Sequence, residues 1–420
     1  MKKIGIIFSI LMACLFVSCG KETVSTVEIW HTYNGMQKDA LEASAQAFNE
    51  SQSKYVVKVL AQDSSSFADS VYNAVANGIG PSIIFNYGST AVDYAKNGLA
   101  VNIQNYIDED LKKGDSTMKD LIESLPSAMK MDIYGFSDGG IYYVPGCTTG
   151  PVFFYNKTQF NKLGLNPPKD WDELEAVSKK YYEATGKAAF HSDGLVDNIQ
   201  AILMQNACGY IDVANKKVSF TENDLSKIYQ WYADCCKKGY FEFNTVGKYS
   251  SEDLANGTIG SFSGSCVNDQ YITMLNGDEL GMAPWIGSSN GVDFYTAWNR
   301  GPIFLKRADD VDRGAYEFVK FFLSGENGAK WAIANSALTP YGKCSETQVY
   351  KDYINNIPAT SALPCVQANM DYSGSFPNVT GAAQVRNILV KYLNYTVDGQ
   401  MTSKEAAAAC IEDCNTALNK

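Results

Sequence analysis

Aromatic and polar side chains gather at the ends of predicted strands in this chain, where they could bind a polar solute. Tyr33 and Asn34 follow the first predicted strand, and Asp63 and Tyr87 follow the second and third. In open α/β sheets, ligands lie outside the carboxyl ends of the strands. A flat ring can pack on the C–H faces of a sugar while amides and carboxylates hydrogen-bond its hydroxyls. These four residues are predicted ligand contacts, although Asp63 is equally typical of an exposed loop.

Further polar, aromatic and basic candidates come later in the chain. Ser263 and Ser265 end another predicted strand, and Tyr341 is an aromatic residue where the chain is expected to cross between domains. Arg386 is one of few basic residues in an apolar C-terminal segment. Its guanidinium could bind a phosphate through two parallel N–H donors, but an arginine that forms a salt bridge on a helix flank is equally typical. Both interpretations stay open, and Arg300 is a weaker candidate for an anionic ligand.

Composition limits the chemistry that these residues could do. The chain has 420 residues, of which 45% are hydrophobic and 19% charged, and this is enough for two ordinary domains. A formal net charge of −11 argues against binding nucleic acid, whose phosphates need a basic face. The two histidines, His31 and His191, exclude a three-histidine zinc site and disfavour a histidine-based catalytic triad. We therefore expect no metal and no cofactor, and we expect His31 to pack or cap at a strand end.

The N-terminus has the pattern of an export signal. Two lysines precede an apolar run over 4–17, which is too short to span a bilayer as a mature helix and stops at Cys19. Residues 1–18 resemble a bacterial lipoprotein signal, and the resemblance implies that Cys19 becomes the lipidated first residue of the mature protein. An ordinary cleaved signal is the alternative. We expect the rest of the chain, beginning with a tether over 19–25, to be exported and held to the cell envelope by lipid, on its periplasmic or extracellular face.

The cysteine pattern does not indicate a metal site. After Cys19, nine cysteines remain, an odd number that cannot all pair within one chain, and they lack the doublets of a zinc ribbon. We expect most of them to act as small buried hydrophobes, with one or two disulfides left possible and unassigned. The nine are Cys147, Cys208, Cys235, Cys236, Cys266, Cys344, Cys365, Cys410 and Cys414.

Strands and helices alternate in the first part of the chain. Short β-rich runs are separated by segments with helical spacing of apolar residues, which is typical of βαβ units and a parallel sheet. The predicted strands are 26–29, 55–60 and 82–85, and the predicted helices are 36–49, 67–77 and 90–97.

A second unit begins near Ile141. Strands are predicted at 141–144 and 152–155, and Asp170 is predicted to cap a helix, with Glu173 in the capping-box position. No flexible linker separates two domains, so short β-segments that cross between them would fit. The remaining predicted helices are 171–184, 198–208, 223–238, 313–323, 327–335, 382–393 and 403–418, and the remaining strands are 258–262 and 297–305.

Six segments of the mature chain match, in order, segments of one known family. They are Val27–His31, Pro151–Lys157, Phe160–Leu174, Asn256–Gly260, Tyr316–Ser324 and Asn335–Tyr341. On these segments the chain resembles the family 1 extracellular solute-binding proteins of ABC importers, the group that contains maltose- and glycerol-3-phosphate-binding proteins.

The resemblance implies an α/β protein with the two-lobed, type II periplasmic-binding-protein fold. The lobes would be 26–148 with 297–338, and 149–296 with 339–420, with the ligand cleft between them. Closure would be a hinge motion around a sugar, an oligosaccharide or a glycerol phosphate. The closed protein, expected to be a monomer, would then dock on the permease subunits. No bond is broken in this function, so the resemblance implies that the protein is not an enzyme.

The resemblance also implies particular site residues. Thr148 and Thr149 match positions where hydroxyl side chains meet the ligand. Trp298 and Asn299 lie where the family usually has a glycine pair at the cleft; a tryptophan there favours a stacked ring and weighs against close approach of the backbone to a phosphate. In the glycerol-phosphate branch, an arginine at a place similar to Arg386 meets the ligand.

Two other functions would share this composition. An exported glycoside hydrolase would also be acidic and rich in aromatic residues, but it needs two carboxylates that face each other across a cleft. A sensor subunit that reports ligand state to a receptor would share the fold and differ only in its partner. The ordered family segments favour the transport function over the hydrolase.

Overall fold

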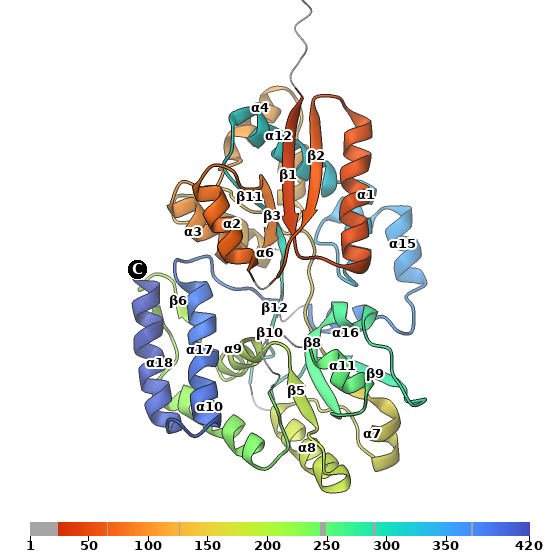
Figure 1. Ribbon diagram of the computed structural model, residues 1–420, viewed down its shortest axis with the longest axis vertical. Coiled ribbons are helices and arrows are strands. Elements are labelled where there is room, and N and C mark those ends of the chain that lie inside the picture. The colour runs from red at the N-terminus through yellow and green to blue at the C-terminus, as the bar shows by residue number, and fades with distance from the viewer. Residues whose placement is uncertain (1–23, 65, 126, 244–248, 289–290, 371–372) are drawn as a thin grey trace, which may run out of the picture.

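The chain folds into two α/β lobes that are stacked along the long axis of the molecule (Figure 1). The structure, a computed structural model, describes residues 24–64, 66–125, 127–243, 249–288, 291–370 and 373–420. The predicted signal and Cys19 lie outside the described residues. Within those residues, no helix has the length and apolar character needed to cross a bilayer. The two-lobed architecture that the sequence predicted is therefore present.

The first lobe contains a four-stranded sheet in the order β11-β3-β1-β2. Strands β1, β2 and β3 run parallel, and β11 joins the edge antiparallel to β3. The three parallel strands confirm the strands that the sequence predicted in this region. Their bounds are β1 Ser25–His31, β2 Tyr55–Ala61, β3 Ile83–Asn86 and β11 Gly301–Phe304.

Helices cover both faces of this sheet because each presents an apolar stripe to it. Helix α1 buries Leu41, Ala45 and Phe48, which are spaced by three and four residues. Helix α12 has the same character and packs on β1 (Figure 1). The helices of this lobe are α1 Gly35–Ser51, α2 Phe67–Ala76, α3 Gly88–Lys96, α4 Gln104–Lys112, α5 Thr117–Glu123, α6 Ser127–Tyr134, α12 Asp309–Phe322 and α13 Gly325–Ala334.

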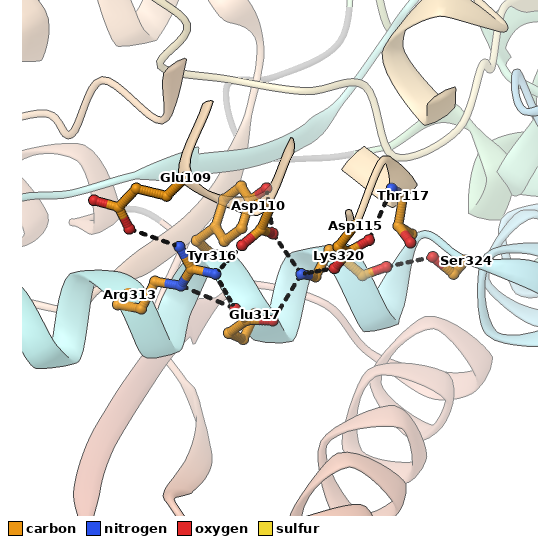
Figure 2. A network of polar contacts seen from close by, with 9 residues as sticks. All are labelled: Glu109, Asp110, Asp115, Thr117, Arg313, Tyr316, Glu317, Lys320 and Ser324. Carbon is orange, nitrogen blue, oxygen red and sulfur yellow. Dashed lines mark hydrogen bonds and ion pairs between the residues drawn. The ribbon is translucent and has the colours of Figure 1, made fainter. Parts of the chain in front are cut away.

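A network of charged side chains ties α4 to α12 (Figure 2). Asp110 of α4 is 4% exposed and accepts hydrogen bonds from Lys320 Nζ at 2.6 Å and from the Tyr316 hydroxyl at 3.0 Å. Arg313 contacts the same carboxylate and also Glu317. Because a buried carboxylate is tolerated only when it is paired and hydrogen-bonded, these contacts fix the position of α4 against α12.

The second lobe contains another four-stranded sheet, in the order β5-β8-β4-β9. Strand β8 runs antiparallel to β4 and parallel to β5. The strand predicted at 258–262 begins later, at Ser261, because 256–260 forms a turn after α11. The strands are β4 Pro151–Asn156, β5 Phe190–Ser192, β8 Ser261–Ser265 and β9 Leu280–Pro284, with a small hairpin of β6 Ile211–Asp212 and β7 Lys217–Val218.

Helices surround the second sheet and build its own core. The predicted cap of α8 forms, since the Asp170 carboxylate accepts from Glu173 N at 2.8 Å. The Glu173 carboxylate accepts from Lys169 N instead of Asp170 N, so the predicted capping box is incomplete. The helices are α7 Lys157–Leu163, α8 Trp171–Thr185, α9 Leu195–Gln205, α10 Glu222–Lys237, α11 Ser250–Ala255, α16 Leu363–Asn369, α17 Ala382–Val397 and α18 Ser403–Leu418, with a 3-10 turn η1 at Cys266–Gln270.

The chain crosses between the lobes in extended segments that pair only briefly. Thr149 pairs with Trp298 and Thr148 pairs with Leu338 in isolated antiparallel bridges. Short strands β10 Tyr295–Thr296 and β12 Ser373–Gly374 pair in parallel nearby. These pairings agree with the short β-segments that the sequence predicted in place of a linker.

Two predictions about this region were wrong in their bounds. The segment 141–144 is not a strand, because Tyr143 alone pairs with Ile303 and the next partner, Pro302, has no N–H to donate. The strand predicted at 297–305 is likewise shorter, since its first residues belong to the crossing and regular pairing begins at Gly301.

The packing also differs from the predicted division of the lobes at 338/339. Helices α14 (Gly342–Ser345) and α15 (Gln348–Asn355) contact α13, and Cys344 and Tyr350 belong to the core of the first lobe. The chain returns to the second lobe with α16, which packs on β9 and β4. The sequence did not predict α14 and α15 because they are short, four and eight residues, and a helical period is difficult to recognise over so few positions.

The nine later cysteines are all free thiols. Seven of them are buried, as expected of small apolar side chains. Cys410 and Cys414 lie on one face of α18 with their Sγ atoms 3.9 Å apart. The hydrogen bond with the Cys410 thiol and burial both raise the pKa of Cys414, so the Cys414 thiol stays protonated at neutral pH.

Candidate ligand-binding site

A cavity of about 670 Å³ lies between the two lobes and is lined from both. It is larger and more polar in character than two other cavities of about 440 Å³, one beside α15 and one beneath Trp285. Its volume is in the range of small-molecule sites. Seven of the residues that the sequence predicted as ligand contacts line it: Tyr33, Asn34, Tyr87, Thr149, Ser265, Trp298 and Arg386.

The first-lobe wall is built from the ends of β1 and β3 and the start of β11. The ring of Tyr33 is 4% exposed and packs edge-on against Phe85 and Trp331, with ring centroids 5.6 and 5.2 Å away. The guanidinium of Arg300 lies over the Tyr33 ring at 4.7 Å from its centroid. Burial raises the pKa of Tyr33, so its hydroxyl stays protonated at physiological pH and can donate. Aromatic packing against Phe85 and Trp331 holds the Tyr33 ring in position.

Hydrogen bonds to neutral acceptors hold Arg300 in this wall. Its Nε donates to the carbonyl oxygen of Phe85 at 3.0 Å, and its Nη2 donates to Thr32 Oγ1 at 3.4 Å. Phe85 belongs to β3 and Thr32 follows β1, so the side chain bridges two neighbouring parallel strands at their carboxyl ends.

The second-lobe wall contains a hydrogen-bonded ion pair. Asp197, in the first turn of α9, accepts from Arg386 Nη1 at 3.0 Å and from Nη2 at 3.4 Å. The indole Nε1 of Trp298 donates to the same carboxylate at 3.2 Å. Arg386 also stacks on Phe376, 3.8 Å from the ring centroid. Of the two interpretations of Arg386, the salt bridge is therefore the one present in this structure.

A second carboxylate, Asp193, follows the short strand β5. It accepts hydrogen bonds from Ser250 N at 2.9 Å, from Ser250 Oγ at 2.8 Å and from Asn268 Nδ2 at 3.1 Å. Burial raises the pKa of Asp193 against the effect of these donors. Such a carboxylate at the edge of a cavity is suited to accept hydrogen bonds from the hydroxyls of a solute.

Three predicted contacts are buried in the crossing or the first core and do not line the cavity. Thr148 donates through Oγ1 to Asn299 Oδ1 at 3.1 Å, and Asn299 donates through Nδ2 to Asp132 at 3.0 Å. Tyr341 is 1% exposed, and its hydroxyl donates to the Pro145 carbonyl oxygen at 2.5 Å. These side chains hold the crossing segments together, so in this structure they have a structural role and not a ligand contact.

The other two predicted contacts lie elsewhere. Ser263 is buried within the second sheet, where its Oγ donates to Ser192 Oγ at 2.8 Å. Residues two apart in a strand share a face, but only Ser265, the last residue of β8, lines the cavity. Asp63 is exposed, and the neighbouring Ser64 lines the cavity in its place.

The lobes touch each other beside the cavity. Tyr87 of the first lobe packs edge-on against Phe376 of the second, with ring centroids 5.9 Å apart. Ser375 and Asn378, from the same loop as Phe376, donate to the side chain and the carbonyl oxygen of Asp132 on α6. The two lobes are therefore in direct contact at this side of the cavity.

Comparison with known proteins identifies the family. A family described as "Bacterial extracellular solute-binding protein" matches residues 43–359, which is well over half of the chain. This chain belongs to that family of solute-binding proteins. The resemblance that the ordered sequence segments predicted is thereby confirmed.

Relatives and solved structures extend over almost the whole chain. The sn-glycerol-3-phosphate-binding periplasmic protein UgpB of Rhizobium meliloti is 23% identical, over 94% of this chain and 94% of that protein. The GacH receptor of Streptomyces glaucescens, solved unliganded and with acarbose, has a TM-score of 0.80 at 18% identity, over 95% of this chain and 100% of that one. UgpB of Mycobacterium tuberculosis, solved with glycerophosphocholine, has a TM-score of 0.79 at 15% identity, over 94% and 99%. At these identities the structural likeness shows the fold alone.

Sequence reasoning missed several residues that line the cavity of this solute-binding protein. Asp193 could have been found, since Asp-Gly follows the short strand β5, but a three-residue strand is a weak signal. Asp197 and Asn268 lie in a helix and a 3-10 turn without distinctive spacing. Tyr249 and Tyr271 line the cavity from loops of the second lobe, and no sequence pattern marks them.

Proposed function

We propose that this protein is the solute-binding component of an ABC importer and that it holds a small polar solute in the cavity between its lobes. The observation that carries the proposal is the cavity itself, which both lobes line with aromatic rings and hydrogen-bonding groups. Rings such as Tyr33 and Trp298 would pack on the solute, and Asn34 and Asp193 would bond its hydroxyls. The solute would be a sugar, an oligosaccharide or a glycerol phosphate, as the names and ligands of the relatives suggest.

The fold suits capture by closure. Each lobe has its own hydrophobic core, and the crossings between them pair only in isolated bridges. Small changes in the backbone angles of the crossings can therefore rotate one lobe against the other, as in hinge closure around a ligand. We propose that the closed monomer then docks on membrane permease subunits, and that the solute leaves chemically unchanged.

Calorimetric titration of the purified protein with neutral sugars and glycerol phosphates tests this proposal. We expect one class to bind with 1:1 stoichiometry and to raise the melting temperature, because a ligand that binds only the folded state stabilises it. Chromatography of the solute after incubation should show no product. Turnover of the solute would instead support the exported hydrolase and contradict the transport function.

We also propose that the protein is exported and anchored by lipid on Cys19. Labelled palmitate fed to producing cells should be incorporated into the wild-type protein and not into Cys19→Ala. The variant should leave the membrane fraction while keeping its solute affinity, since the anchor lies outside the lobes. Incorporation into both proteins would overturn the assignment of the anchor to this residue.

A further inference from the structure

One cation that lines the cavity, Arg300, is not paired with a carboxylate of the described residues. Among the described residues, the cavity is lined by two cations, Arg300 and Arg386, and by two carboxylates, Asp193 and Asp197. Their positions decide which of them a solute would meet as a net charge.

Arg386 is already neutralised by the protein. Both of its terminal nitrogens donate to the Asp197 carboxylate, and the face of its guanidinium is covered by Phe376. Trp298 adds a third donor to the same carboxylate. A solute would therefore meet this group as a closed ion pair with little net charge.

Within the described part of the chain, Arg300 has no such partner. No carboxylate of the described residues lies within salt-bridge distance of its guanidinium, and its two hydrogen bonds go to a carbonyl and a hydroxyl. A guanidinium carries five N–H donors, so Nη1 and one hydrogen of Nη2 have no acceptor in the described protein. A partly buried cation without a counter-charge is costly unless a ligand supplies the charge.

The second-lobe wall supplies hydrogen-bond acceptors. Asp193 lies there and accepts from Ser250 and Asn268. The cavity thus has the guanidinium of Arg300 on its first-lobe wall and carboxylate oxygens on its second-lobe wall. This polarity fits a solute with an acidic group at one end and hydroxyls at the other.

We propose that the solute carries an acidic group, a phosphate ester or a carboxylate, and that this group binds Arg300 and not Arg386. The inference rests on the proposed function as a solute-binding protein and narrows its solute class. The sequence favoured Arg386 over Arg300 as the residue that binds an acidic group. The structure favours Arg300 instead, because Arg386 is already paired with Asp197. The guanidinium of Arg300 can donate two parallel hydrogen bonds to either acid, and its stacking on the Tyr33 ring holds it in place.

The test compares three variants with five probes by calorimetry. The probes are glycerol 3-phosphate and glucose 6-phosphate as phosphate esters, glucuronate as a carboxylate, and glucose and maltose as neutral sugars. The variants are Arg300→Gln, Arg300→Lys and the double change Arg386→Gln with Asp197→Asn, which removes both charges of the ion pair together. Melting temperatures of all variants report whether the fold is kept, and Arg300→Lys keeps the charge where the glutamine variant proves unstable.

We expect the wild type to bind an acidic probe and Arg300→Gln to weaken that binding by about 10- to 100-fold, the loss expected for a charge-assisted hydrogen bond. Arg300→Lys should lie between the two, and the double variant should lose less affinity for the acidic probe than Arg300→Gln does. Comparison of the phosphate esters with glucuronate then identifies which acid is preferred.

Three results would overturn the inference. If the wild type binds only glucose or maltose, the acidic solute is wrong and the proposed function stands. If Arg300→Gln keeps the affinity for the acidic probe while the double variant loses it, Arg386 is the residue that reads the acid. If none of the five probes binds, both the inference and the proposed sugar or glycerol-phosphate solute are overturned.

Discussion

At the scale of single residues, Trp298 shows how one side chain can serve both a crossing and a cavity. Its backbone exchanges two hydrogen bonds with Thr149, at 2.8 and 3.1 Å, and these fix its position. Its indole then lines the cavity and donates to Asp197. Because the ring is only 9% exposed, its removal would affect stability as well as binding.

Trp298→Phe separates these two contributions. The phenylalanine keeps an aromatic face but lacks the N–H donor, and Asp197 keeps both bonds from Arg386. We expect the free energy of unfolding to fall by about 1 kcal/mol and solute affinity to fall several-fold, measured by urea denaturation and calorimetry. Trp298→Ala should weaken binding far more than it lowers the melting temperature. An equal loss of both in the alanine variant would assign the ring to the core.

At the scale of elements, the junction of α4 with α12 depends on charge and not on apolar packing alone. Lys320 of α12 contacts Asp110 and Asp115, at 2.6 and 2.7 Å, and both Lys320 and Asp110 are largely buried (Figure 2). Breaking a buried pair by removing one partner leaves an unpaired charge, which is more costly than the loss of an exposed pair.

Lys320→Met should therefore destabilise the first lobe. We expect the free energy of unfolding to fall by about 2–4 kcal/mol in urea, while solute affinity is kept because the network does not line the cavity. Lys330→Met is the matched control: its ion pair with Glu326 is exposed, and we expect a change below about 0.5 kcal/mol. Equal effects of the two variants would show that the network of Figure 2 is not a stabilising unit.

Acid unfolding gives a second readout of the same network. Hydrogen bonds from Lys320 and Thr117 lower the pKa of Asp115 below the ordinary aspartate value. A carboxylate whose folded-state pKa is lowered contributes stability above its unfolded pKa, about 3.9, and loses it as the pH falls further. Lys320→Met should therefore unfold at a higher pH than the wild type when acid unfolding is followed by circular dichroism. An unchanged midpoint would contradict this role.

At the scale of the whole molecule, a buried carboxyl lies where the lobes touch. Asp132 of the first lobe accepts from Ser375 of the second and from Asn299 of the crossing. Burial raises the pKa of Asp132 to about 6, and the two donors lower it less. When ionised, this carboxyl therefore opposes the contact between the lobes.

The expected pH effect follows from the sign of that shift. A group whose pKa is higher in the folded state takes up a proton on folding below about pH 6, so acidification stabilises the folded protein relative to a variant without the group. Between pH 7.5 and 5, the melting temperature of the wild type should rise relative to that of Asp132→Asn, by an amount equivalent to roughly 1–3 kcal/mol. The lowered pKa of the buried His31 works in the opposite direction but is common to both proteins. A constant difference in melting temperature would contradict the prediction.

Much of the fold could be predicted because its signals are local. The parallel strands of the first lobe and helices such as α1 and α10 follow from the spacing of apolar residues, and the six ordered segments identified the family. Tyr33 and Tyr87, which were predicted from the rule that ligands lie at the carboxyl ends of strands, line the cavity. Ser263, predicted from the same rule, does not line it, because it lies two residues before the end of β8 and its hydroxyl bonds Ser192 inside the sheet.

What the sequence determined by itself is the kind of protein: an exported, two-lobed binder with aromatic and polar residues at its strand ends. What only the tertiary structure decided is the state of each charge in the cavity. Asp197 meets Arg386 and Trp298 across long stretches of chain, while Arg300 donates only to neutral acceptors among the residues that the structure describes. The pairing of a charge depends on distances between residues far apart in the chain, and such distances exist only once the lobes have folded and met.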